Sequence, residues 1–279
     1  MADNSQPVPR GPPTGSLVFP GALRDRLEPL LAQALIDPVA HYQHLTLTFA
    51  TSLDSSIALA PGTQTALSGG MTKGMTHYLR FKHDAIVVGV GTAVADDPGL
   101  NCRLRDAGGY GGKGLRGQPR PIVLDPKCRW QFSASSKVMD LAAQKKGKAP
   151  YIICTKEPPE DRRALLESLG GKFIILDPFS DDGKLPWKQI LHALRREGLN
   201  RIMVEGGRTI INDLLEPQNH ELVDSIIVTI APVWLGQGGV VVSPPQRSDD
   251  NGQPIAAVRV SDSKWEIFGK DVVLFGKPT

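Results

Sequence analysis

Short runs of β-branched residues alternate with segments of helical spacing along most of this chain. The strand-like runs lie at 44–51, 85–91, 121–125, 150–155, 172–177 and 200–204. Apolar residues recur at helical intervals between most of them, at 72–83, 134–144, 159–169, 186–197 and 208–216. Strands that are apolar on both faces lie inside parallel sheets covered by helices. The alternation therefore predicts an α/β fold with a central, mostly parallel sheet flanked by helices.

The C-terminal part of the chain has a different pattern. Runs at 223–233, 256–260 and 264–275 have the composition of strands, and no helical segment separates them. Consecutive strands without a crossover helix are typical of antiparallel pairing. We expect these runs to form antiparallel C-terminal strands that close one edge of the sheet.

The N-terminus is rich in proline. Prolines recur among small polar residues through residues 1–20, which bury little apolar surface. We expect a disordered tail over 1–20, so a chain that begins at Gly21 should keep its fold. Helical spacing follows at 23–36, where Pro29 interrupts it and Pro38 ends it. No second linker or internal repeat follows, which predicts a single domain over 21–279.

The charge balance limits the classes of partner. The chain has 32 Lys and Arg against 29 Asp and Glu, a net charge of +3. So small an excess gives no broad electrostatic footprint for nucleic acid or a membrane surface. No window approaches the ~20 apolar residues of a membrane span, and the N-terminus lacks a secretory pattern. We expect a cytoplasmic protein with no nucleic-acid or membrane partner, although a few arginines in one cleft could bind a small anion.

The cysteines and histidines show none of the spacings that are typical of metal sites. Cys102, Cys128 and Cys154 are far apart and form no C-x-x-C pair, and no H-E-x-x-H occurs. Disulfide frameworks and zinc sites need closely set ligands, so we expect neither. The nucleophile elbow of hydrolases and the signature of zinc deaminases are also absent.

Two glycine motifs have different contexts. GYGGKG at 109–114 matches G-x-G-x-x-G, but no strand precedes it, so we interpret 106–119 as a flexible surface loop. Glu205-Gly206-Gly207 instead follows a buried strand and leads into a helix. Glycines let a backbone approach a ligand closely, and a helix N-terminus binds phosphate. From the pattern alone, phosphate binding and a plain strand-to-helix turn are equally compatible with this tripeptide.

Polar residues follow several of the predicted parallel strands. Asp54, Thr92, Asp96 and Glu205 all lie at carboxyl ends of such strands, where ligands of parallel sheets bind. Asp54 and the segment 92–98 could instead serve helix-capping turns. Their coincidence predicts one rim of the sheet that carries a functional site.

Three blocks of the sequence carry a family resemblance. In order and spacing, these blocks resemble the signature blocks of the riboflavin-pathway reductases. They are TFATSLDSSIAL at 48–59, HYLRFKHDAIVVGVGTAVADDPGLNCRL at 77–104 and MVEGGRTIINDLL at 203–215. The likeness is strongest to the stand-alone reductases of 2,5-diamino-6-ribosylamino-4(3H)-pyrimidinone 5′-phosphate, and it spans about residues 40–276. It implies a dihydrofolate-reductase-like fold, a homodimer, and reduction of the ribosyl side chain to the ribitylamino product. It also implies NADPH as hydride donor, with NADH left open.

The resemblance also implies roles for individual residues. NADP binding falls on Thr92 and Asp96 and on the glycine turn with the helix start, which are Gly206, Gly207, Arg208 and Thr209. Substrate contacts fall on Arg80, Leu100, Arg103 and Glu205. The two arginines suit the dianionic 5′-phosphate, because guanidinium groups bind it in bidentate fashion.

Two carboxylates are the candidate catalytic residues. Glu205 could hold a ribose hydroxyl or a cationic imine, and Asp54 could bind the substrate or relay a proton.

The sequence departs from the family pattern at Ser55, where glycine is usual, and in the glycine-rich insert at 106–118. Two alternatives stay open: a reductase of the same fold acting on a pterin or folate, and a non-catalytic nucleotide- or RNA-binding protein that uses the insert.

Overall fold

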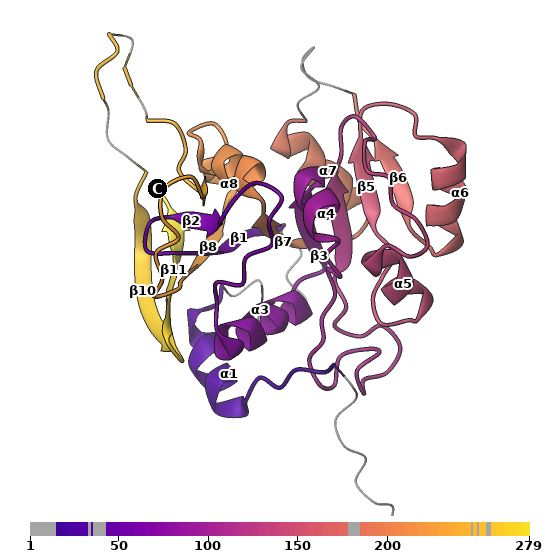
Figure 1. Ribbon diagram of the computed structural model, residues 1–279, viewed down its shortest axis with the longest axis horizontal. Helices are drawn as coiled ribbons and strands as arrows, with labels where there is room; N and C mark the ends of the chain where they lie inside the picture. Colours follow the sequence, from indigo (N-terminus) through magenta and orange to yellow (C-terminus); the bar gives the residue numbers. More distant parts are fainter. Residues whose placement is uncertain are drawn as a thin grey trace, which may run out of the picture.

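The computed structural model describes residues 15–32, 35, 43–177, 185–246, 248–249, 251–254 and 258–279. Within this part of the chain, one nine-stranded sheet runs through the molecule in the order β10-β11-β8-β1-β7-β3-β4-β5-β6 (Figure 1). The strands are β1 (His44–Thr51), β3 (Ala85–Gly89), β4 (Arg120–Leu124), β5 (Tyr151–Cys154), β6 (Lys172–Ile175), β7 (Arg201–Gly206), β8 (Ser225–Ile230), β10 (Val260–Phe268) and β11 (Asp271–Pro278). A separate small ladder pairs β2 (Ser56–Ala58) with β9 (Val240–Val241).

Helices cover both faces of the sheet (Figure 1). On one face α7 (Trp187–Arg196) and α8 (Arg208–Leu215) pack on side chains of β1, β3 and β7. On the other face lie α1 (Gly21–Leu27), α3 (Gly70–Lys82), α4 (Val90–Asp96), α5 (Lys137–Ala143) and α6 (Glu160–Ser168). Two short 3-10 helices, Glu28–Leu30 and His220–Leu222, complete the described helices. Apolar side chains alternate along the strands between the two faces, which is why each strand reads as a nearly continuous apolar run.

The expected α/β fold is confirmed, with one difference in strand direction. We expected the run 223–233 to be antiparallel, but β8 pairs parallel to β1 and antiparallel only to β11. α8 and the 3-10 helix at 220–222 carry the chain from the carboxyl end of β7 back to the amino ends of the strands. β8 therefore begins at the same edge as β1 and runs parallel to it. The run 264–275 is not one strand, because the chain reverses between β10 and β11. The run at 256–260 lies partly outside the described residues.

The expected tail differs from the structure at residues 15–20. Leu17 donates its N–H to the carbonyl of Arg103, and Phe19 is only 2% exposed between Tyr78 and Phe268. Disorder is therefore wrong for this segment, because one aromatic side chain supplies the apolar area that the surrounding prolines lack. Residues 1–14, most of the expected tail, lie outside the described residues. The single domain over 21–279 stays a prediction.

Candidate active site

The carboxyl ends of three neighbouring strands form the rim on which most predicted site residues lie. β7 pairs parallel to β1 on one side and to β3 on the other, so their ends share an edge of the sheet. Asp54 follows β1, Thr92 follows β3, and Glu205 lies at the end of β7. Strand order thus brings together residues that are far apart in the sequence.

The glycine turn after β7 contacts the helix after β3. Gly207 donates its N–H to Thr92 Oγ1 at 2.9 Å, and a Cβ at Gly207 would lie 3.0 Å from the same oxygen. Gly206 has a φ of +123°, a conformation that other residues rarely adopt. Since Thr92 Oγ1 accepts from Gly207, its own hydroxyl proton remains available as a donor. The turn is therefore a close backbone approach that requires both glycines.

The N-terminus of α8 offers free backbone donors beside this turn. No side chain caps the helix, and Arg208 and Thr209 in its first turn are exposed. Uncapped N–H groups and the helix dipole attract phosphate groups. Thr92 and Asp96 lie one turn apart on the same face of α4, and burial raises the pKa of Asp96. The predicted cofactor residues thus lie on α4 and on the adjoining start of α8, which together we call the cofactor wall.

Arg80 and Glu205 form an ion pair at the centre of the rim. Arg80 Nε donates to Glu205 Oε1 at 2.7 Å and Nη2 donates to Oε2 at 2.6 Å. The two side chains are 15% and 18% exposed. Burial alone lowers the pKa of Arg80, but the adjacent carboxylate outweighs it and raises that pKa. The planar fork of Arg80 orients Glu205, and the phosphate contact that we expected of Arg80 stays a prediction.

The segment from Leu100 to Arg103 forms a second wall. Leu100 has a φ of +46° and its side chain, 2% exposed, packs in the core, so only its backbone can face a ligand. Arg80 Nη1 donates to the carbonyl of Asn101 at 3.0 Å. Arg103 donates its backbone N–H to His77 Nδ1 at 3.0 Å. These contacts tie the predicted substrate segment to α3.

Asp54 has several partners of its own. Its carboxylate accepts from the Ser52 hydroxyl, from Leu235 N–H at 3.1 Å and from Gly236 N–H at 2.7 Å. These hydrogen bonds, with Ser52 foremost, lower the pKa of Asp54. Asp54 therefore fastens the segment after β8 to the rim. The proton relay that we considered for it stays a prediction.

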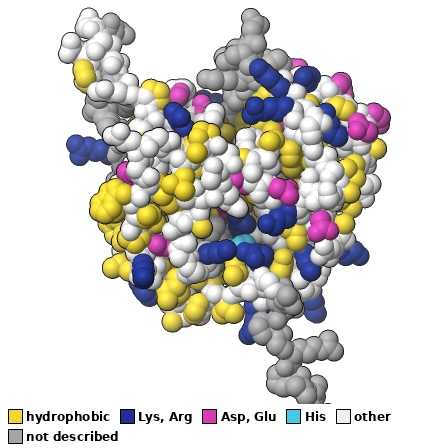
Figure 2. Space-filling model, viewed as in Figure 1, with side chains coloured by type: hydrophobic (Ala, Val, Ile, Leu, Met, Phe, Trp, Pro, Cys, Tyr) yellow, Lys and Arg dark blue, Asp and Glu magenta, His cyan; other side chains and the backbone are white. Residues whose placement is uncertain are grey.

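Basic side chains gather on the α3 side of the rim. Figure 2 shows Lys and Arg side chains around a histidine near the centre of this face, in front of α3. His77 on α3 has Arg80, Arg103 and Lys73 as its charged neighbours, and burial followed by these cations lowers its pKa to about 2. Sequence patterns did not single out His77 or Lys73. The only available signal was their spacing of four residues on one predicted helix.

Comparisons with known proteins identify the family of this chain. Residues 43–274 match the family described as RibD C-terminal domain. A Candida glabrata protein named 2,5-diamino-6-ribosylamino-4(3H)-pyrimidinone 5′-phosphate reductase is 39% identical over 255 residues, covering 90% of this chain and 96% of its own. The chain belongs to the RibD C-terminal domain family.

A second relative and two solved structures extend the match. A Saccharomyces cerevisiae protein with the same reductase name is 38% identical, covering 82% of this chain and 84% of its own. The structure titled Saccharomyces riboflavin biosynthesis reductase Rib7 has a TM-score of 0.70 at 33% identity, covering 92% of this chain and 99% of that one. Acinetobacter baumannii RibD has a TM-score of 0.66 at 20% identity, and 92% of this chain covers 63% of it, so it supports the fold alone.

The glycine-rich insert of this RibD C-terminal domain is packed, not flexible as we expected. Cβ atoms at Gly108 and Gly112 would lie 2.4 Å and 2.1 Å from backbone oxygens. Tyr110 is 4% exposed, and its hydroxyl accepts from Asn101 Nδ2 at 3.0 Å. Gln118 bonds both ways to the backbone of Cys102, at 2.8 Å and 2.7 Å. The glycines are needed for close packing, and the insert supports the 101–103 segment.

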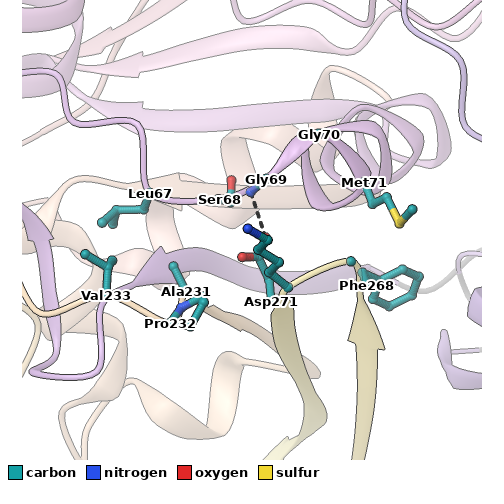
Figure 3. Close-up of a pocket in the computed structure, with 12 residues that line it drawn as sticks. Leu67, Ser68, Gly69, Gly70, Met71, Ala231, Pro232, Val233, Phe268 and Asp271 are labelled. Atoms are coloured by element: carbon teal, nitrogen blue, oxygen red, sulfur yellow. Dashed lines mark hydrogen bonds between the residues drawn. The ribbon is translucent and has the colours of Figure 1, made fainter.

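A pocket beside the turn between β10 and β11 lies apart from the predicted site residues. It has a volume of about 430 Å³ and is lined by residues 67–71, 231–233 and 268–271 (Figure 3). Asp271 accepts the N–H of Gly69 there at 2.7 Å and also binds the Thr72 hydroxyl, so it caps α3. None of the residues predicted for the site lines this pocket.

Metal and membrane features are not found in the described part of the RibD C-terminal domain. No group of three or more His, Cys, Asp or Glu side chains there is arranged to hold a metal ion. No described helix is both long enough and apolar enough to cross a membrane.

Proposed function

We propose that this protein is an oxidoreductase that reduces the ribosyl side chain of 2,5-diamino-6-ribosylamino-4(3H)-pyrimidinone 5′-phosphate to the ribitylamino product, with NADPH as reductant. Its relatives from Candida glabrata and Saccharomyces cerevisiae are named for this substrate. The observation that carries the proposal is the uncapped N-terminus of α8, with its glycine turn on Thr92, directly beside the Arg80–Glu205 pair. This arrangement supports a cofactor phosphate site next to a fixed carboxylate on one rim.

The cofactor wall suits a nicotinamide dinucleotide. Backbone N–H groups at Arg208 and Thr209 would bind the pyrophosphate, and the Thr92 hydroxyl and Asp96 carboxyl would bind neighbouring polar groups. NADPH, when bound, supplies the hydride. NADH is the weaker candidate, and comparing the two dinucleotides in the same assay decides between them.

The substrate wall suits a phosphorylated sugar-amine. The ribosylamino group opens to an imine, whose C1′ accepts the hydride while its nitrogen takes a proton. An imine is already electrophilic, so the protein mainly positions both partners and stabilises charge. Glu205, oriented by Arg80, would accept a hydrogen bond from a ribose hydroxyl or stabilise the protonated imine. Arg103 would bind the 5′-phosphate, since none of the described acidic side chains pairs with its guanidinium.

We also propose a cytoplasmic homodimer. In the described part of the chain, β10 forms the edge of the sheet and exposes Trp265 at 56% and Ile267 at 62%. An edge strand with large exposed apolar residues favours burial against another chain.

The decisive assay follows NADPH absorbance with the ribosylaminopyrimidine phosphate made enzymatically. We expect the substrate-dependent loss of absorbance to be accompanied by one equivalent of the ribitylamino product. Turnover of dihydrofolate in its place would favour a folate or pterin reductase. Absence of oxidation with either compound, together with RNA binding through the insert, would favour a non-catalytic protein.

A further inference from the structure

His77 is a buried residue in the wall of the candidate active site. It lies on α3 between Lys73 and Arg80, one helical turn from each, so all three share a face of the helix. His77 is only 5% exposed. A buried polar ring needs partners for its nitrogens, so each nitrogen has to be accounted for.

The contact with Arg103 determines which ring nitrogen carries the proton. Nδ1 lies 3.0 Å from the backbone nitrogen of Arg103, which can only donate. Nδ1 must therefore be the acceptor, and in the neutral ring the proton lies on Nε2. The pKa of about 2, caused by burial and by the cations Arg80, Arg103 and Lys73, keeps the ring neutral at physiological pH.

The second ring nitrogen of His77 has no partner among the residues that the structure describes. Across the described residues, no hydrogen bond joins Nε2 of His77 to another group, and Nε2 is not one of the fully enclosed unpartnered nitrogens. It is therefore an N–H donor that solvent can reach and that has no partner among the described residues. A donor held in this way is oriented for a ligand before the ligand arrives.

The charges around this donor select the class of ligand. Arg80 is paired with Glu205, but Lys73 and Arg103 form no ion pair with any acidic side chain that the structure describes. The charged groups acting on His77 are all cations. A neutral N–H donor beside two uncompensated cations is suited to an anionic oxygen.

We propose that the Nε2–H group of His77 donates a hydrogen bond to the phosphate monoester of the substrate, beside Arg103 and Lys73. The nature of the anion rests on the proposed function. Arg103 contributes twice, because its backbone fixes the orientation of the ring while its guanidinium binds the same phosphate.

Two amide substitutions separate this role from simple structural support. In His77→Asn the side-chain oxygen can take the place of Nδ1 and accept from Arg103, but no group reaches the position of Nε2. In His77→Gln an amide N–H can reach the position of Nε2, but the acceptor for Arg103 is lost. His192→Asn, at an exposed histidine of α7, is the matched control.

We expect His77→Asn to raise KM for the substrate and Kd for ribose 5-phosphate by about tenfold, while Kd for NADPH stays constant. His77→Gln should recover most of this loss, and His192→Asn should match the parent. Calorimetry measures binding, and circular dichroism checks folding. Parent-like binding by His77→Asn, or a larger loss in His77→Gln than in His77→Asn, overturns the proposal and leaves His77 as a support for Arg103.

A spectroscopic readout works even if both variants are unstable. In the parent protein, ¹⁵N-edited spectra should show protonation of His77 at Nε2 alone across about pH 5–8, and the Nε2 resonance should shift on titration with ribose 5-phosphate. A resonance that does not move contradicts the proposal. If the sugar phosphate binds through His77 but the parent does not oxidise NADPH with the ribosylaminopyrimidine phosphate, only the proposed function fails.

Discussion

At the scale of single residues, Gly207 and Thr92 make the closest contact of the cofactor wall. Gly207→Val would place a branched Cβ 3.0 Å from Thr92 Oγ1 and push the turn away from α4. We expect Kd for NADPH to rise by about tenfold or more, at about 1.4 kcal/mol for each factor of ten. Calorimetric titration measures this change. Gly70→Ala is the control, because a Cβ there meets no atom within 4 Å; equal binding by both variants would remove the turn from the cofactor site.

The Arg80–Glu205 pair is the second residue-scale test. Arg80→Met leaves the Glu205 carboxylate, whose side chain is 18% exposed, without its cation. We expect the free energy of unfolding to fall by about 3 kcal/mol, because an uncompensated buried charge is costly. Adding Glu205→Leu should return part of this loss. Arg163→Met, at a surface pair whose Glu157 side chain is 77% exposed, should cost less than about 1 kcal/mol in the same urea titration.

At the scale of elements, the segment before α1 is predicted to stabilise the fold. Phe19 lies 5.4 Å from Tyr78 and 6.5 Å from Phe268 between ring centroids. Phe19→Ala should lower the free energy of unfolding by about 3 kcal/mol, because a buried aromatic ring is lost. Val18→Ala, at a residue that is 58% exposed, should change it by less than about 0.5 kcal/mol. A Phe19→Ala protein with the thermal midpoint of the parent would restore the original idea of a dispensable tail.

The glycine-rich insert gives a second test at this scale. A Cβ at Gly112 would lie 2.1 Å from the carbonyl oxygen of Asp106, whereas at Gly114, with a φ of +54°, it would meet nothing within 4 Å. Gly112→Ala should therefore cost about 3 kcal/mol through overpacking, and Gly114→Ala about 1 kcal/mol through backbone strain. Because the insert supports Arg103, Gly112→Ala should also raise KM for the substrate. Similar thermal midpoints for the two variants would indicate a loose insert.

At the scale of the whole molecule, we expect the edge strand β10 to form the interface of the homodimer that we propose. Ile267→Asp puts a charge among residues that are exposed in the single chain, so the monomer should keep its fold. Burial of that charge in an interface would be unfavourable, so we expect the sedimentation coefficient to fall to the monomer value. Leu115→Asp, at an apolar residue of the insert that is 38% exposed, is the control. A parent protein that sediments as a monomer rejects the homodimer.

Sequence patterns predicted part of the candidate site because parallel strands impose a simple geometry. Asp54 and Thr92 follow strands and Glu205 lies at the end of one, and parallel neighbours end on the same edge. Their partners could not be predicted in this way. Arg80 lies 125 positions from Glu205, and Asp54 binds Gly236 at a separation of 182 positions. Such contacts depend on how helices and loops pack on the sheet.

The sequence by itself determined the layered α/β fold, because the periods of strands and helices and the apolar runs depend only on local order. The direction of β8, the packing of Phe19 and the compact insert were decided by the tertiary structure. Each depends on space left by distant segments, which no local pattern records. The same holds for His77, whose tautomer follows from the backbone of Arg103, 26 positions further along the chain. Local sequence specifies which groups are present, and tertiary packing decides which of their atoms stay free to bind a ligand.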